Sequence, residues 1–269
     1  ELTNSTRYVL IVVLKQLLSN SANPSTNAYE ESNSESDTLI LQYFLKSLKF
    51  FNIMNIPIKQ ALIVTLLTGL HNQPLLIYPI LQDDILPFIY DELEAKLEFR
   101  KTIPMGPYKY NIDEGLEIRK LSYEFLYTIL SIDINLNSNY GVKYIEIVNN
   151  ILEKGFKDTE NDIIILSSVN LTTFINKSPD ILNEQDILEK LIEQITLALS
   201  KKLKAKPSKQ ESESYEECQK SILNLCKIIN TILSNSSENK NTRKINIRGG
   251  QLQKWNTYYI NEVKRNFEI

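Results

Sequence analysis

The sequence predicts an all-α fold in which pairs of helices stack into an α-solenoid, with one β-hairpin inserted near residues 97–112. Only 7 glycines and 9 prolines occur among 269 residues, too few for a sheet-rich protein with many tight turns. Apolar residues recur with helical spacing through most of the chain, whereas residues 97–112 alternate with a period of two. Helix is therefore the rule and the hairpin is the exception.

The first expected helix, residues 8–18, is apolar on almost all sides, which is typical of an inner helix. It begins too near residue 1 for an earlier helix to cover it, and the ends of a solenoid need polar capping units. We therefore expect this N-terminal face to dock further repeats, on the same polypeptide or on a separate one. Residues 19–36 are rich in Asn, Ser and Glu, so we expect a low-complexity loop there.

The next helices lead into the hairpin. Asp37 is a suitable N-cap for one helix, and Pro57 suits the first turn of the helix that follows. The expected elements are a helix after Asp37, a helix at 58–70, a short turn starting at Pro74 and a helix at 85–96.

Residues 97–112 predict the hairpin itself. On the first arm Phe99 and Ile103 fall on the same side of the period-two pattern, and on the second arm Tyr108 and Tyr110 alternate with polar residues. The connecting residues 104–107 read PMGP, in which proline presets φ and glycine accepts a positive φ. Since an isolated two-stranded ribbon is marginally stable in water, this hairpin needs a docking surface, either on its own scaffold or on a partner.

Helices resume after the hairpin, and Asp113 can cap the first of them. Pro207 interrupts a lysine-rich stretch at 201–210, where we expect an exposed loop. The pitch of roughly one helix pair per 40 to 50 residues is that of HEAT repeats, and we treat residues 1–269 as one such array. The expected helices are 114–131, 140–153, 160–176, 185–203, 211–233 and 251–267, the last of them capping the array.

Composition and motifs exclude several function classes. The net charge is −3 and the basic residues are dispersed, so we expect no nucleic-acid partner. No apolar run reaches the roughly 18 residues that span a bilayer, and no signal peptide pattern opens the chain, so we expect no membrane partner and an intracellular location. Cys218 and Cys226 are too far apart along one expected helix for a disulfide, and we interpret them as reduced core thiols.

The sequence offers no catalytic centre. His71 is the single histidine, and metal sites need several ligands at suitable spacing. Phosphate-binding glycine motifs and the nucleophile elbow are both missing from the sequence. We therefore expect no enzyme activity, no cofactor and no metal. Trp255 and the tyrosines beside it are interpreted as packing residues rather than a recognition cage.

Several segments resemble one family. The residues MGPYKYNIDEGLEIRK at 105–120 resemble a segment from the C-terminal region of the CAND family, the cullin-associated exchange factors built from HEAT repeats. RYVLIVVLK at 7–15, IKQALIVTLLTGLHNQP at 58–74, ILPFIYDEL at 85–93 and KLKAKPSKQE at 202–211 resemble further pieces in the same order. The resemblance covers nearly the whole chain and departs from the family at residues 19–36 and in the tail from Asn235.

The resemblance implies a non-enzymatic regulator, cytoplasmic and nuclear, that lies around an unneddylated cullin with its RING subunit, together with the N-terminal HEAT repeats of the same factor. It further implies that the hairpin occupies the place of the substrate-receptor adaptor, so that competition promotes exchange in cullin-RING ubiquitin ligases. The residues expected to contact the partner are Phe99, Arg100, Met105, Gly106, Pro107, Tyr108, Lys109, Tyr110, Lys204, Lys206 and Lys209.

Other interpretations stay open. The chain could be a generic HEAT scaffold or transport adaptor that binds a peptide motif in its concave face, and an enzyme with an unrecognised site is a third possibility. Within the first hypothesis, the hairpin could be an arm that only closes a gap in the solenoid. The lysine-rich stretch could be a solvated surface or a patch that speeds encounter with an acidic partner.

Overall fold

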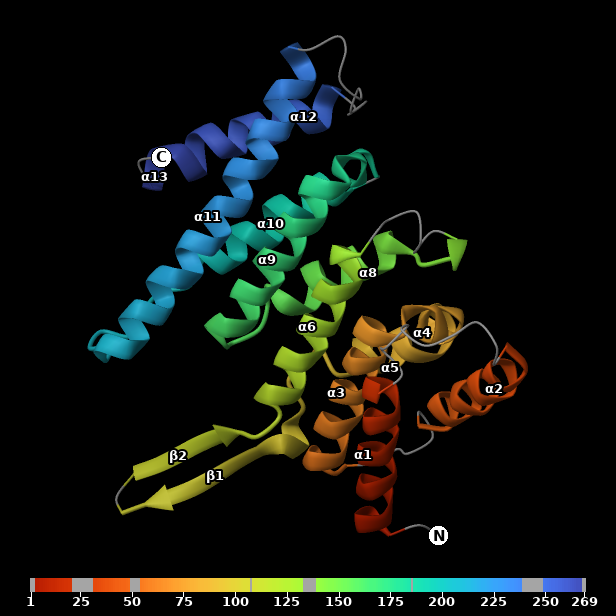
Figure 1. Ribbon diagram of the computed structural model, residues 1–269. Helices are drawn as coiled ribbons and strands as arrows, with labels where there is room; N and C mark the ends of the chain where they lie inside the picture. The colour runs from red at the N-terminus through yellow and green to blue at the C-terminus, as the bar shows by residue number, and fades with distance from the viewer. Residues whose placement is uncertain are drawn as a thin grey trace. The chain divides into compact units, whose positions relative to one another are not determined.

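The structure, a computed structural model, describes residues 3–20, 31–48, 54–106, 108–132, 139–184, 186–238 and 249–267. Within these ranges helices dominate and a two-stranded antiparallel sheet is present (Figure 1). The predicted all-α class with an inserted hairpin is therefore confirmed, while the assignment of helix pairs to HEAT repeats stays a prediction. The chain divides into two compact units, Glu1–Val142 and Lys143–Ile269, and each is described by itself.

The first unit is built around α3 (Ile56–Asn72), which contacts α1 (Asn4–Asn20), α4 (Pro74–Ile80) and α6 (Leu116–Ser131). Helix α1 packs on α3 with Ile11, Leu14 and Leu18, which recur at helical spacing and are at most 2% exposed. Helix α2 (Glu31–Leu48) packs on α4. The predicted loop at 19–36 is therefore wrong at 31–36, where α2 has begun, and residues 21–30 lie outside the described ranges.

A second correction concerns Pro74, which starts α4 (Pro74–Ile80) rather than a turn. Proline is well tolerated there because the first N–H groups of a helix have no intrahelical acceptor. Pro79 lies inside the same helix and has no N–H to donate to the preceding turn. The helix then continues with the wider spacing of a π-helix in η1 (Leu81–Ile85), and as α5 (Leu86–Asp91).

The hairpin follows after a single 3₁₀ turn, η2 (Leu97–Phe99). Strand β1 (Arg100–Met105) pairs antiparallel with β2 (Tyr108–Asp113), and α6 (Leu116–Ser131) comes next. The strands thus start three residues later than the predicted hairpin. Gly106 opens the connection with a φ of +62°, a conformation that glycine adopts without steric cost. Figure 1 shows the ribbon projecting away from the helices of its unit.

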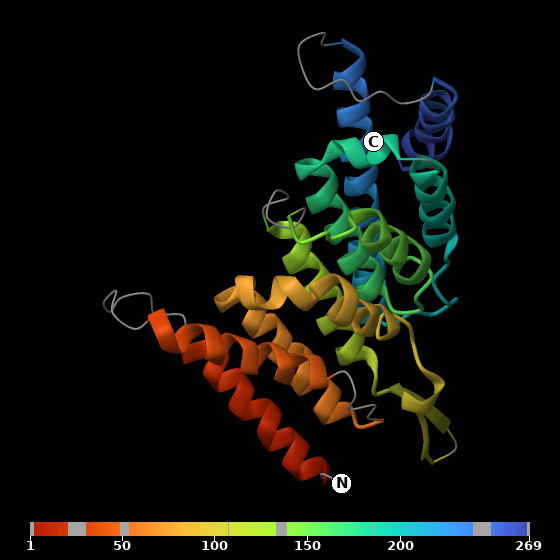
Figure 2. The same cartoon turned by 90° about the vertical axis from the view of Figure 1, so that its right-hand side faces the viewer.

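The second unit consists of helices, in two views in Figures 1 and 2. Helix α11 (Lys209–Glu238) packs on α9 (Asn161–Lys177), and α10 (Ile187–Ser200) packs on both α11 and α12 (Gly249–Tyr258). The predicted lysine-rich loop and the predicted last helix are both present, at 201–208 and at 249–267. None of the helices in the described ranges could cross a membrane. The elements are α8 (Tyr144–Asn150), η3 (Ile151–Gly155), α9 (Asn161–Lys177), η4 (Pro179–Asn183), α10 (Ile187–Ser200), α11 (Lys209–Glu238), α12 (Gly249–Tyr258), η5 (Tyr259–Lys264) and α13 (Arg265–Phe267).

Candidate partner-binding surface

The register of the hairpin separates its residues into two faces, because residues directly opposite each other in an antiparallel pair share a face. One face holds the pairs Lys101–Ile112, Ile103–Tyr110 and Met105–Tyr108, and we call it the apolar ribbon face. The other holds Arg100–Asp113, Thr102–Asn111 and Pro104–Lys109, and we call it the polar ribbon face. The hairpin is therefore amphipathic across its thickness.

The centre of the apolar ribbon face is open to solvent. The side chains of Ile103 and Tyr110 are 42% and 61% exposed, although they lie opposite each other and share a face. On the polar ribbon face the Thr102 hydroxyl donates to Asn111 Oδ1 over 2.8 Å, so part of its polar surface is satisfied internally. An exposed aromatic and aliphatic pair of this kind is typical of a surface that a partner covers.

The backbone groups at the edges of the ribbon follow from the same register. The Glu114 N–H donates to the Phe99 carbonyl over 3.0 Å, which makes this pair a hydrogen-bonded one, and hydrogen-bonded pairs alternate with non-hydrogen-bonded pairs along the ladder. The Pro104–Lys109 pair is therefore non-hydrogen-bonded, and its backbone groups point outward. Proline has no N–H to offer at that position.

The base of the hairpin is buried in its own unit. Phe99 is 5% exposed, and its ring lies over Gly115, where an added Cβ would come within 2.9 Å of Phe99 Cδ2. The expectation that Phe99 contacts a partner is corrected here, because its side chain has no surface to offer. It lies in the turn before β1, whereas the predicted strand pattern counted it as part of the arm.

The second strand ends in a network with α6. Asp113 Oδ1 accepts the Gly115 N–H over 3.0 Å, and Asp113 Oδ2 accepts Arg119 Nη1 over 2.8 Å. Arg119 is 1% exposed, so this ion pair is shielded from solvent. Asp113 was expected to cap a helix starting at residue 114, but the helix begins at Leu116 with Gly115 as its N-cap.

The segment before the hairpin is held by a buried carboxylate. Glu92 is 2% exposed and accepts hydrogen bonds from Lys59 of α3 and from Lys96. Burial lowers the pKa of Lys96, but its hydrogen bonds to Asp91 and Glu92 outweigh burial and raise the pKa above its ordinary value. Both ends of the hairpin are therefore tied to the helices of the first unit.

The remaining predicted hairpin residues lie on or near its surface. Arg100 and Lys109 are exposed on the polar ribbon face, and Gly106 is exposed in the connection. The side chains of Met105, Pro107 and Tyr108 fall outside the described part of the chain. The sequence-based list of contact residues omitted Ile103, although Ile103 falls on the same side of the period-two pattern as Phe99, which was on that list.

The predicted lysine residues belong to the second unit. Lys204, Lys206 and Lys209 are all exposed. Lys204 Nζ lies 3.3 Å from Glu211 Oε1, and Lys209 Nζ lies 3.6 Å from Glu213 Oε1. The Ser208 N–H and the Lys204 ammonium lower the pKa of Glu211, which keeps that carboxylate charged. The loop is therefore a mixed-charge surface, less basic than its lysines alone indicate.

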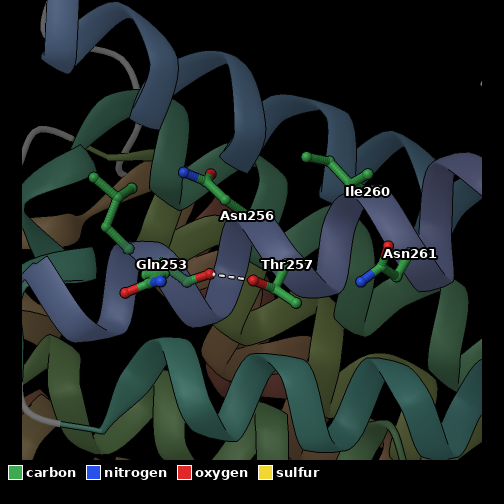
Figure 3. Close-up of a pocket in the computed structure, with 6 residues that line it drawn as sticks. Gln253, Asn256, Thr257, Ile260 and Asn261 are labelled. Atoms are coloured by element: carbon green, nitrogen blue, oxygen red, sulfur yellow. Dashed lines mark hydrogen bonds between the residues drawn. The ribbon is translucent and has the colours of Figure 1, made fainter.

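A concave surface also lies in the second unit, between α10 and α12. A groove of about 740 Å³ is lined there by Ile192, Thr257 and Tyr258. Along the exposed side of α12 and η5, uncharged polar side chains surround Ile260 (Figure 3). The Thr257 hydroxyl donates to its own helix, to the Gln253 carbonyl, over 2.9 Å. The groove between α10 and α12 is also lined by Glu189, Glu193 and Lys254, so it offers a polypeptide both apolar and charged contacts.

The remaining candidates for chemistry are dispersed or buried. No group of three or more metal-binding side chains occurs within the described ranges. Burial raises the pKa of the Cys218 thiol to about 11 and that of the Cys226 thiol to about 12, which keeps both thiols neutral. Trp255 is fully buried, so its interpretation as a packing residue is confirmed.

Comparison with known proteins identifies relatives of the chain. Residues 76–264 match the family described as TATA-binding protein interacting (TIP20). The chain is 38% identical over 270 residues to Cullin-associated NEDD8-dissociated protein 1 of Candida albicans, which covers 98% of this chain and 21% of that protein. It is 30% identical to the protein of Emericella nidulans named Cullin-associated NEDD8-dissociated protein 1, C-terminal part, over 65% of this chain and 16% of that protein. The chain is 27% identical to Cullin-associated NEDD8-dissociated protein 2 of mouse over 70% of this chain and 14% of the mouse protein. It thus spans about a fifth or less of the length of these relatives.

Proposed function

We propose that this chain, which belongs to the family of cullin-associated NEDD8-dissociated proteins and corresponds to their C-terminal region, is a non-enzymatic arm that binds a cullin. The partner in this proposal is an unneddylated cullin with its RING subunit. The hairpin occupies the position of the adaptor that carries substrate receptors. Competition for this position promotes exchange of receptors in cullin-RING ubiquitin ligases.

The observation that carries this proposal is the apolar ribbon face. Ile103 and Tyr110 are displayed on a projecting ribbon instead of being packed on its own helices. Large apolar and aromatic side chains contribute most of the binding energy in interfaces. Once the apolar ribbon face is bound to a surface, the ribbon sterically excludes a second protein from that surface.

The experiment that tests it is a titration of an unneddylated cullin–RING complex with the whole chain, measured by calorimetry. We expect Ile103→Asp combined with Tyr110→Ala to weaken binding by at least about 1 to 2 kcal/mol, the scale of interface hot spots. Met105→Asp combined with Tyr108→Ala, one pair nearer the turn, should have a similar effect. Excess adaptor should displace the unmodified chain.

The matched control is Thr102→Ala combined with Asn111→Ala, a directly opposed pair on the polar ribbon face of the same strands. This variant should bind as the parent chain does, and circular dichroism should show unchanged helix content in all variants. Unaltered affinity in both apolar-face variants would remove the proposal. An equal loss in the polar-face control would mean that the ribbon as a whole, and not its apolar face, contacts the cullin.

A second contact in the proposal is with further helical repeats of the same factor. On α1, Val9, Val13 and Leu17 follow one another at four-residue spacing and are at least half exposed, on the side away from the α3 contact. An apolar stripe of this kind is typical of a helix that packs on two neighbours. We place the preceding repeats on this face, whether they are covalently attached or supplied by a separate chain.

The alternative function, a scaffold that binds a peptide motif, would use helix-lined grooves instead of the ribbon. The groove between α10 and α12 is the observation that favours it. If the ribbon makes the contact, Ile192→Asp in this groove should leave cullin binding unchanged, whereas it should abolish binding of a partner segment that occupies the groove. Loss of cullin binding in this variant, with the ribbon variants unaffected, would favour the alternative.

A further inference from the structure

The direction of the ribbon is decided at its base, because two strands without a third have little stiffness of their own. The base joins η2 and β2 to the start of α6 through four residues: Phe99, Asp113, Gly115 and Arg119. We call this group the base clamp. All four lie within the first unit, and three of them fall within the short segment 113–119.

Glycine is required at position 115 because a larger residue would collide with Phe99, and not because the backbone there has an unusual conformation. Its φ is −81° and its ψ is −7°, a conformation open to every L-residue. An added Cβ would, however, lie 2.9 Å from Phe99 Cδ2 and 3.2 Å from Phe99 Cβ. The missing side chain therefore lets the Phe99 ring lie directly on the turn between β2 and α6.

Asp113 uses both of its carboxylate oxygens in the same turn. One accepts the Gly115 N–H over 3.0 Å and the other accepts Arg119 Nη1 over 2.8 Å. Arg119 lies one turn into α6 and is 1% exposed, so the side chain cannot swing into solvent. A short ion pair with a buried arginine links the last residue of β2 rigidly to the helix.

We propose that the base clamp is a positioning device that holds the ribbon in one orientation relative to its own helices, so that the apolar ribbon face is preorganised for a partner. The inference rests on the proposed function for its biological meaning, but the rigidity itself does not depend on a cullin. Preorganisation matters because only the fraction of molecules in the competent orientation binds, and the apparent affinity falls in proportion to that fraction.

The rigidity is tested by pulsed electron resonance between two nitroxide labels, at Lys109→Cys on the ribbon and Glu124→Cys on α6, both exposed positions of the first unit. The native thiols are buried, and the chain without introduced cysteines serves as the labelling control. We expect a narrow distance distribution in the parent. Gly115→Ala, which displaces Phe99, and Asp113→Asn, which removes the charge paired with Arg119, should each shift or broaden it.

A second substitution that restores the distance distribution distinguishes loss of ribbon positioning from a general loss of folding. Phe99→Leu added to Gly115→Ala provides room for the new methyl group and should narrow the distribution again. Asn111→Ala, on the ribbon but outside the base clamp, should leave it unchanged. If Gly115→Ala does not fold, Asp113→Asn carries the test, because it keeps an acceptor for the Gly115 N–H.

The same variants then report on the proposed function separately. If loss of the base clamp leaves a tenth of the ribbons correctly oriented, affinity for the cullin–RING complex falls about tenfold. An unchanged distance distribution in folded Gly115→Ala and Asp113→Asn variants would overturn the inference. A parent chain with a narrow distribution but no cullin binding would instead overturn the proposed function and leave the base clamp standing.

Discussion

At the scale of single residues, the buried thiols make the most direct prediction. Cys226 is fully buried and Cys218 is 5% exposed, and burial raises the pKa of both thiols, to about 12 and about 11. The thiolate is the reactive form. We expect neither cysteine to react with a thiol reagent at pH 8 in the folded chain, and both to react after denaturation. Labelling of either thiol at a rate close to that of the unfolded chain would contradict this.

The same pKa shifts predict a loss of stability at alkaline pH. In the folded chain the thiols keep their protons above pH 9, the ordinary pKa from which both are raised, whereas in the unfolded chain they release them. The unfolded state then binds fewer protons, so the free energy of unfolding decreases as the pH rises from about 9. Urea midpoints at pH 8 and pH 10 measure this, and the decrease should be smaller in the Cys218→Ala, Cys226→Ala variant.

Residue-level sequence reasoning succeeded where local pattern decides and failed where packing decides. The exposure of Lys109 and Tyr110 follows from their place on a two-stranded ribbon. The burial of Phe99 does not, because a period-two pattern gives no sign of where an arm leaves its base. Gly115 and Arg119 passed unnoticed since nothing in the sequence places one beneath a ring or the other beside Asp113.

At the scale of elements, α3 shows how a helix interior can require glycine. Gly69 is buried, and an added Cβ would lie 2.8 Å from Ile77 Cδ1 and 3.3 Å from Leu18 Cδ1. We expect Gly69→Ala to destabilise the chain by about 1 to 3 kcal/mol through overpacking, against the higher helix propensity of alanine. Thermal unfolding measures the change.

Gly250 is the matched control, because it is also helical and has nothing within 4 Å of an added Cβ. Gly250→Ala should be neutral or slightly stabilising. Equal stability of the Gly69→Ala variant and the parent would show that Ile77 moves aside at little cost, and that the close approach of α1 and α4 to α3 is less tight than the distances indicate.

Element boundaries were predictable where capping or turn chemistry is local. The last helix and the lysine-rich loop are present as expected, whereas the turn predicted at Pro74 was wrong because a proline can open a helix. Residues 31–36 were misread because their Ser and Asn content suggests a loop, although they form the first turns of α2. The helical ends are decided by neighbours that the sequence does not reveal.

At the scale of the whole molecule, the exposed stripe on α1 predicts that binding needs more than this chain. We expect the chain alone to bind a cullin weakly, and a polypeptide that also carries the N-terminal repeats to bind far more tightly, because linked sites raise the effective concentration of each other. Titration of the same cullin–RING complex with both polypeptides measures the difference. Tight binding by the chain alone would contradict the prediction.

Pro104 has a consequence for the behaviour of many copies together. A bare ribbon is a template on which identical strands could add one after another and grow into filaments. The outward position at Pro104 lacks the amide that such growth would use, and the opposite edge carries the exposed, charged Lys109. Both edges of the ribbon therefore disfavour pairing with a strand of another copy, so the protein can expose its apolar ribbon face in solution without forming filaments through these edges.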